Sequence, residues 1–261
     1  MRKIAVVLLL CLAVLAGCGA PVQSEKEKIT SLSQLSGKKI AVLEDSPAES
    51  IVSEKFPDAT MKKEKTLLDA VVSLNKDKAD AIVFVDTVLN YAVEENGAFS
   101  ILPEPVQQFH YVIAASQDNS VLIEQVNGAI NQLKSEGTID EMKSRWFQKG
   151  DSENLVMPQI PEPESEETLT VGVEAVMIPF SYKNAAGQVI GFDVELAKRI
   201  GLLTGKKIEI KTMDFQLMKP SLQEKTVDLA IVGINDVDSM VDTAVISEPY
   251  MSGNYAVLVK N

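Results

Sequence analysis

Cysteine and histidine are scarce in this chain of 261 residues. Its 2 cysteines, Cys11 and Cys18, stand near the N-terminus, and its 1 histidine, His110, precedes an apolar strand expected at 111–115. The chain has no Cys and His cluster with the spacing of a metal site, no P-loop and no Gly-x-Ser-x-Gly segment. A lone histidine beside an apolar strand is more often structural than a general base. The sequence therefore predicts a protein that is not an enzyme and needs no cofactor or metal.

The N-terminus lacks an apolar run long enough to cross a bilayer. Arg2 and Lys3 precede an apolar run over 4–16, whereas a spanning helix needs roughly 20 apolar residues. The run ends in Leu-Ala-Gly-Cys at 15–18, which resembles a bacterial lipobox. We predict a lipoprotein signal peptide and lipobox at 1–18, with Cys18 as the lipidated first residue of the mature protein. The alternative is an ordinary secretory signal with a chance cysteine.

Positive charge is also in short supply. The 25 Lys and Arg residues against 37 Asp and Glu give a formal net charge of −12, and loss of Arg2 and Lys3 would make it −14. Such a charge repels nucleic acid, so we expect no nucleic-acid partner. The mature chain would keep only Cys18, which excludes an internal disulfide. Residues 19–30 are mostly polar and are expected to form a tether.

The folded part of the sequence contains an internal echo. Residues 67–83 can be laid over residues 215–231, with Asp80 matching Asp228. Each segment has apolar residues at helical spacing, then a charged turn, then an aspartate that opens an apolar strand. Further strands are expected upstream at 38–43 and 206–211. Although any α/β protein shows such patterns, the repeat of strand, helix and strand favours two similar α/β lobes, and Asp80 and Asp228 are expected to have structural roles.

Several short motifs give this echo a more specific interpretation. They resemble the extracytoplasmic solute-binding proteins that serve polar amino acid ABC importers. The motifs are LSGKKIAV at 35–42, ADAIV at 79–83, GTIDEMKSRWF at 137–147, GFDVELAKRI at 191–200, MDF at 213–215, VDLAIVG at 227–233 and SEPY at 247–250. The resemblance implies an α/β, two-lobed clamshell of the type II periplasmic-binding-protein class, with ligand bound between the lobes.

The two halves stand in reversed order relative to that family. We therefore predict a circular permutation, with the new chain ends opened at the hinge. The expected organisation is lobe 2 at 31–113, C-terminal helices packing on lobe 1 at 114–148, a linker at 149–167, and lobe 1 with a hinge strand at 168–261. The linker is acidic, rich in proline and without apolar periodicity. The alternatives are a truncated tandem array or a chain completed by swapping.

The resemblance also implies a set of ligand-binding positions. Phe215 matches the aromatic residue that covers the ligand, Met177 stands in the place of a second one, and Phe180 belongs to the same segment. Glu174 matches an acidic position that reads polar side chains. The full expected set is Ser46, Asp86, Glu174, Met177, Phe180, Phe215, Gly233, Asn235 and Met240. Phe215 and Met177 can instead be core residues.

The remaining positions concern the charged ends of the ligand. Asp86 matches the aspartate that binds an ammonium group, and Ser46 stands at a helix N-terminus that can hold an anion. Ser46 before Pro47 is also a common helix start. Asp193 is expected to cap the helix that follows it. Met240 replaces the arginine that usually holds the carboxylate, and Asn235 replaces a hydroxyl residue.

Without that arginine, we expect a negative cleft that suits a cationic ligand or that has lost amino acid binding. The sequence thus predicts a monomeric, lipid-anchored extracytoplasmic protein that delivers a polar or cationic amino acid, or a related small molecule, to an ABC permease. The alternative is a degenerate binding module that acts as a sensor or as the partner of a membrane protein.

Overall fold

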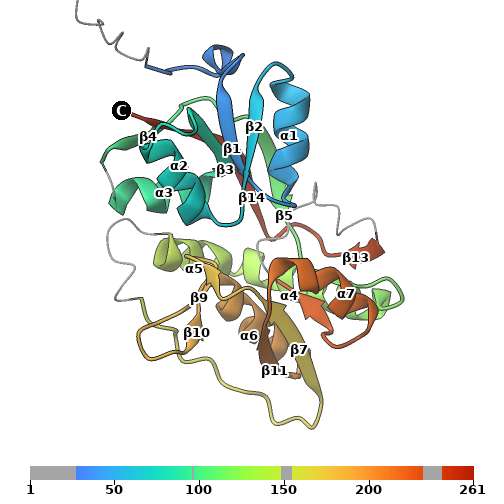
Figure 1. Cartoon of the computed structure of the whole chain (residues 1–261). Coiled ribbons are helices and arrows are strands. Elements are labelled where there is room, and N and C mark those ends of the chain that lie inside the picture. The colour runs from blue at the N-terminus through green and yellow to red at the C-terminus, as the bar shows by residue number, and fades with distance from the viewer. Residues whose placement is uncertain (1–27, 96, 148–154, 232–242) are drawn as a thin grey trace, which may run out of the picture.

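The computed structural model describes residues 28–95, 97–147, 155–231 and 243–261. These residues form two α/β lobes, one above the other in Figure 1. Lobe 2 consists of residues 28–111 and 251–261, and lobe 1 of the described residues between 114 and 246. The two-lobed α/β fold expected from the sequence is confirmed.

Lobe 2 is built on a six-stranded sheet with the order β2-β1-β3-β14-β4, in which β5 also pairs with β14. The strands β1, β2 and β3 are parallel, while β14 runs antiparallel to β3. The central strand β3 is buried along its whole length because both of its faces are covered, as its AIVFV sequence indicates. The elements are η1 (Leu32–Leu35), β1 (Lys39–Leu43), α1 (Pro47–Lys55), β2 (Thr60–Glu64), α2 (Leu67–Asn75), β3 (Ala81–Val85), α3 (Asp86–Glu95), β4 (Phe99–Ile101), β5 (Gln107–Tyr111) and β14 (Met251–Lys260).

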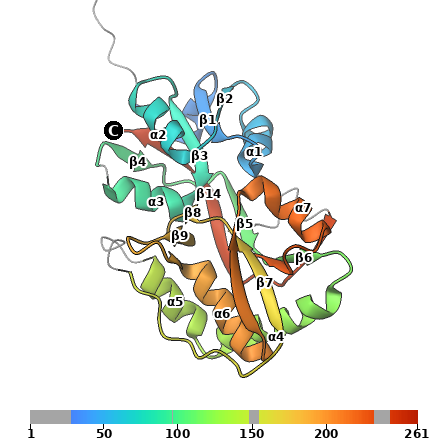
Figure 2. The ribbon, with the colours of Figure 1, turned by 60° about the horizontal axis from the view of Figure 1, so that its bottom comes forward.

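Lobe 1 has a five-stranded sheet with the order β11-β7-β12-β6-β13 and a small sheet with the order β10-β9-β8. Helices α4 and α5 precede the expected linker and pack with α6 beyond it; Figure 2 shows α5 and α6 side by side. The elements are β6 (Ala114–Ser116), α4 (Ser120–Ser135), α5 (Thr138–Trp146), β7 (Thr168–Val173), β8 (Val176–Met177), β9 (Ser181–Lys183), β10 (Val189–Ile190), α6 (Phe192–Thr204), β11 (Lys207–Thr212), η3 (Phe215–Leu217), α7 (Met218–Gln223), β12 (Leu229–Ala230) and β13 (Ala244–Ile246).

The echo in the sequence is partly an echo in the structure: α2 with β3 recurs as α7 with β12, but the upstream strands expected at 38–43 and 206–211 are not equivalent, since β11 corresponds to β2 and β1 corresponds to β7. The parallel strands β2-β1-β3 of lobe 2 correspond to β11-β7-β12 of lobe 1. Asp80 accepts a hydrogen bond from the backbone N–H of Lys39 at 2.8 Å, and Asp228 accepts one from Thr170 at 2.7 Å. Each aspartate therefore fixes the start of its strand against the neighbouring parallel strand, which confirms their structural role.

Two segments cross between the lobes and are hydrogen-bonded to each other. One runs from β5 to β6 through Ile113, and the other runs from β13 to β14 through Ser247. The backbone N–H of Ile113 donates to the Ser247 hydroxyl at 2.9 Å, and the Ser247 N–H donates to the Ile113 carbonyl at 2.8 Å. Further along, the Tyr250 N–H donates to the Tyr111 carbonyl at 3.0 Å. Both crossings are continuous, so the expectation that a hinge strand is cut is wrong.

The described ends of the chain lie instead at the far end of the lobe 2 sheet. The N–H of Asn261 donates to the carbonyl of Ala98 at 2.8 Å, and Ile29 lines the same surface groove as Asn261. The 10 residues of β14 pair with strands of lobe 2, although the sequence placed 168–261 in lobe 1 with a hinge strand. The sequence assigned the junction of the chain ends to the hinge, whereas the structure places the described ends at the sheet of lobe 2.

The expected linker is irregular where the structure describes it. Residues 155–167 contain no helix or strand, and β7 begins directly afterwards. Within the described ranges, no helix is both long and apolar enough to cross a bilayer. The same ranges contain no group of three or more His, Cys, Asp or Glu side chains suited to a metal ion.

An aromatic cluster fills the junction where the crossings meet lobe 1. Phe180 is fully buried between Tyr111 at 5.0 Å and Phe147 at 5.4 Å, measured between ring centroids. Phe192 stacks on Tyr250 at 5.9 Å, and the Tyr250 hydroxyl donates to buried Asp193 at 3.1 Å. Asp193 lies in the first turn of α6, and its carboxylate therefore connects this helix to the hinge. This cluster forms the floor on which the candidate site is built.

Candidate functional site

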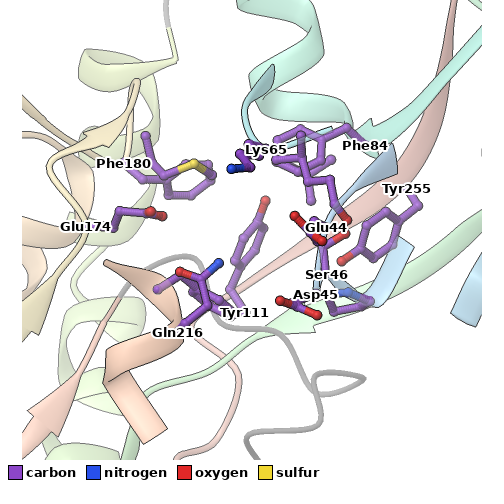
Figure 3. A pocket seen from close by; sticks show the side chains of 15 residues that line it. Glu44, Asp45, Ser46, Lys65, Phe84, Tyr111, Glu174, Phe180, Gln216 and Tyr255 are labelled. Atoms are coloured by element: carbon purple, nitrogen blue, oxygen red, sulfur yellow. Dashed lines mark hydrogen bonds between the residues drawn. The ribbon is translucent and has the colours of Figure 1, made fainter. Parts of the chain in front are cut away.

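A cavity of about 120 Å³ opens between the two lobes, and both lobes contribute to its walls (Figure 3). The volume lies well below the roughly 300–1,000 Å³ of pockets for drug-sized ligands. Lobe 2 and the start of the crossing supply Leu43, Glu44, Asp45, Ser46, Pro47, Lys65, Phe84, Val85, Tyr111 and Tyr255. Lobe 1 supplies Glu174, Met177, Phe180, Phe215 and Gln216. The space therefore suits a small molecule held between the lobes.

The topology explains why the walls come from these segments. Leu43 ends β1 and residues 44–47 directly follow it, while Glu174 directly follows β7, the equivalent strand of the other lobe. The carboxyl ends of parallel strands in an open α/β sheet are where such folds bind ligands. In Figure 3 the side chains of Glu174 and Lys65 enter the space from different sides, and the Tyr111 ring stands at its floor.

Glu174 is the acidic side chain that lobe 1 contributes to the wall. It is partly buried, and its carboxylate accepts a hydrogen bond from the backbone N–H of Phe215. Burial raises the pKa of the Glu174 carboxyl, the Phe215 N–H works against this rise, and the negative charge of Asp214 adds to it. The Ser181 hydroxyl donates to the Glu174 backbone carbonyl at 2.7 Å, which anchors the residue. A cation in the cavity would stabilise the ionised carboxylate.

Ser46 marks the N-terminus of α1, at the opposite wall. Its hydroxyl donates to the Leu43 carbonyl at 2.7 Å and makes no side-chain cap for the helix. The carboxylate of Glu49, in the first turn, accepts the N–H of Asp45 at 2.9 Å and pairs with Lys63. An acidic side chain of the protein thus already lies beside this helix terminus, which weakens it as a site for a ligand anion.

The aromatic side chains divide into buried and partly exposed ones. Phe180 is 0% exposed and belongs to the junction cluster while also touching the cavity. Met177 and Phe215 are partly buried, packed against the core and facing the cavity. The hydroxyl of Tyr111 lies 3.1 Å from the Thr87 hydroxyl, and burial raises the pKa of Tyr111, which keeps it neutral. The cavity thus has an apolar floor with polar edges.

The structure brings five of the expected site residues to one cavity: Ser46, Glu174, Met177, Phe180 and Phe215. Asp86 is not part of its lining. The Asp86 carboxylate accepts hydrogen bonds from Asn254 at 2.8 Å and from the Thr87 N–H at 2.7 Å, at the start of α3. Gly233, Asn235 and Met240 lie outside the described residues. The role of every one of these residues in binding stays a prediction.

Sequence reasoning missed several lining residues. Lys65 stands in a short turn between β2 and α2, and Tyr255 lies midway along β14. Neither belongs to a motif, although Glu44 and Asp45 stand directly beside Ser46 and could have been inferred from it. Three carboxylates, from Glu44, Asp45 and Glu174, face one ammonium group, from Lys65. The negative balance expected for the cleft is present in its described lining, although Asp86 does not contribute.

Comparison with known proteins bears out the family recognised from the motifs. Residues 169–261 match the model of the bacterial extracellular solute-binding proteins, family 3. An ABC transporter glutamine-binding protein from Bacillus subtilis is 25% identical over 127 residues, which are 48% of this chain and 46% of that protein. An arginine-binding extracellular protein from the same organism is 33% identical over 95 residues, 36% of this chain and 37% of that protein.

These relatives are matched over only part of their length. The chain spans about half the length, or less, of the curated relatives named above. Among solved structures, a periplasmic substrate-binding protein of an ABC transporter from Coxiella burnetii is 12% identical to this chain, with a TM-score of 0.45. The match covers 86% of this chain and 85% of that chain.

Proposed function

We propose that this chain, which matches family 3 of the bacterial extracellular solute-binding proteins over residues 169–261, binds an amino acid with a positively charged side chain. The observation that carries the proposal is the cavity between the lobes, in which the partly buried Glu174 carboxylate stands among Phe180, Phe215 and Met177. A cavity that contains a partly buried carboxylate and aromatic faces favours a cationic ligand, because the cation stabilises the ionised carboxylate and is attracted to the rings. The relatives bind glutamine and arginine, which supports an amino acid as the ligand class.

The rest of the proposal concerns how the protein is held and whom it serves. Cys18 in its lipobox-like segment would carry the lipid anchor, and an ABC permease would receive the ligand. One acyl chain gives marginal attachment, so a stable anchor needs the two or more chains of a lipoprotein. Mass spectrometry of the membrane-bound protein would identify the first residue and its acyl groups. An unmodified N-terminus generated elsewhere would contradict this part.

A ligand panel tests the binding function. Arginine, lysine and ornithine should each raise the thermal unfolding midpoint, because a ligand that binds only the folded state stabilises it. Polyamines and glutamate complete the panel, and calorimetric titration gives the dissociation constants. Tight binding of glutamate would contradict the cationic preference. If no member of the panel raises the unfolding midpoint, the alternative is favoured: a degenerate module that senses or binds a membrane protein. The observation that supports this alternative is Met240 in the place of an arginine.

The dependence of binding on pH tests the role of Glu174. Since its pKa is raised by burial, the carboxyl takes up a proton more readily than usual as pH falls. A cation needs the ionised form, so affinity should fall as pH drops through the pKa of Glu174. Glu174→Gln should weaken binding of the best cation about 10-fold or more at neutral pH, the usual cost of losing a charged hydrogen bond. It should also flatten the pH profile.

The unfolding midpoint of the ligand-free protein supplies a second readout for the same variant. The folded pKa of Glu174 lies above its usual value of 4.5, so the ionised group lowers stability once pH rises above that value. Glu174→Gln should therefore unfold at a higher temperature than the wild type at neutral pH without ligand. The control is Glu209→Gln, an exposed change on β11 that removes the same charge away from the cavity. A pH profile that is the same in both variants would contradict the role of Glu174.

A further inference from the structure

Lys65 is a cation at the edge of the candidate site, and it has no ion-pair partner within the described part of the chain. It follows β2 and precedes α2, it is exposed, and it lines the cavity. Its neighbours in the chain are engaged elsewhere, since Lys62 pairs with Glu64 and Lys63 pairs with Glu49. No carboxylate among the described residues pairs with Lys65, although acidic side chains line the same cavity. Its charge is therefore available to a ligand.

Lys65 is also the only basic side chain in the described lining of the cavity. Segment 232–242 carries the family position at which Met240 replaces an arginine, and its sequence contains no lysine or arginine. The other candidate for holding an anion, the start of α1, already has the Glu49 carboxylate beside it. A zwitterion that enters this cavity has one positive group of the protein facing it.

We propose that Lys65 binds the carboxylate of the ligand while Glu174 binds its positive end. The inference rests on the proposed function and adds an orientation: the anionic end of the ligand points to lobe 2 and its cationic end to lobe 1. A flexible four-carbon stem lets an ammonium group follow a carboxylate, whereas a guanidinium needs a fixed fork geometry. Lys65 can therefore reach the carboxylate of the ligand from its exposed turn.

The orientation gives the ligand a direct part in bringing the lobes together. Lys65 belongs to lobe 2 and Glu174 to lobe 1, so one zwitterion would make an ionic contact with each. A ligand shifts a conformational equilibrium only by its difference in affinity for the two states. A molecule with a single charge can make an ionic contact with only one lobe, whereas a zwitterion makes its second ionic contact when both lobes surround it.

The test compares each amino acid with the amine that lacks its carboxylate. Arginine is paired with agmatine, lysine with cadaverine and ornithine with putrescine, and dissociation constants are measured by calorimetry. The wild type should bind the amino acid of the best pair more tightly than the amine. Lys65→Gln should weaken the amino acid by about 10- to 100-fold, leave the amine unchanged or tighter, and so remove the discrimination. Glu174→Gln should weaken both members of the pair by a similar factor.

A matched control separates a local role from general electrostatics. Lys76→Gln removes one positive charge from the exposed end of α2 in the same lobe and should change neither constant more than twofold. If an amino acid binds the wild type and Lys65→Gln keeps the discrimination, the inference is overturned while the proposed function stands. If none of the three amino acids binds the wild type, the proposed function fails and takes the inference with it. Unchanged unfolding midpoints in both lysine variants exclude loss of folding as the cause.

Discussion

Replacing Glu195 by alanine should lower the free energy of unfolding by about 3–5 kcal/mol, the usual effect of breaking a buried ionic cluster. Glu195 is 0% exposed, and both of its carboxylate oxygens lie 2.7 Å from a guanidinium nitrogen of Arg145. Arg199 donates to it at 2.8 Å and the Trp146 indole at 2.6 Å. Both arginines reach solvent, with 31% and 23% of their side chains exposed, so the lower end of the range is expected. Urea unfolding followed by circular dichroism measures the change.

The same cluster joins two segments that lie far apart in the chain. Arg145 and Trp146 end α5, before the expected linker, whereas Glu195 lies on α6, beyond it. Glu209→Ala, an exposed substitution in the same lobe, is the control and should change stability by less than about 0.5 kcal/mol. An equally small effect of Glu195→Ala would mean that the cluster does not hold α5 against α6.

This packing supports our proposal that the chain is a circular permutation of the family's order. The helices before the linker complete the lobe formed after it, and the described ends Lys28 and Asn261 line one groove. A protease cut within 148–167 should then leave two fragments that stay associated, with their helical and strand content retained. Separation of the fragments under native conditions would favour independent units, as in a truncated array.

Replacing Gly191 by alanine should cost about 3 kcal/mol or more and should also disturb the cavity wall. Gly191 precedes α6 with φ +134° and ψ 176°, a region that only glycine adopts readily, and such strain costs about 1–3 kcal/mol. A Cβ atom there would lie 2.2 Å from the backbone oxygen of Phe180, which must then move. Because Phe180 lines the cavity, ligand affinity should fall together with stability. Thermal unfolding and calorimetry measure the two effects.

Gly187 provides the matched control for this prediction. It also has a positive φ, of +75°, but a Cβ atom at this position would meet nothing within 4 Å. Gly187→Ala should therefore cost only the backbone strain, about 1–2 kcal/mol, and should leave ligand binding intact. Equal losses of stability and of ligand affinity in the two variants would show that the contact with Phe180 has no importance.

The repeated units of the fold could be predicted from the sequence because they are local. A strand, a helix and a second strand within about 30 residues leave a periodic pattern, and Asp80 and Asp228 mark equivalent turns in it. The sheet in which β14 pairs could not be predicted in the same way. Its alternating apolar residues specify a strand but not the sheet that receives it, since strand pairing depends on distant partners. The segment was therefore placed at the hinge.

The candidate site shows the same division between motif and tertiary position. Glu174 and Ser46 each follow the first strand of a repeated unit, so a comparison with the family's motifs finds them. Lys65 and Tyr255 reach the cavity only because the sheet of lobe 2 places the turn after β2 and the middle of β14 near it. Asp86 follows a buried strand just as a ligand-binding aspartate would, but the partners Asn254 and Thr87 set its position.

The paired crossings have a mechanical consequence. Two crossing segments without hydrogen bonds between them would let the lobes slide, twist and swing independently. Here the bonds between Ile113 and Ser247 and between Tyr111 and Tyr250 tie them into a short ribbon. A ribbon bends readily across its face but resists shear along its length, so we expect the lobes to rotate mainly about a single axis. Opening and shutting of the lobes would then follow one coordinate.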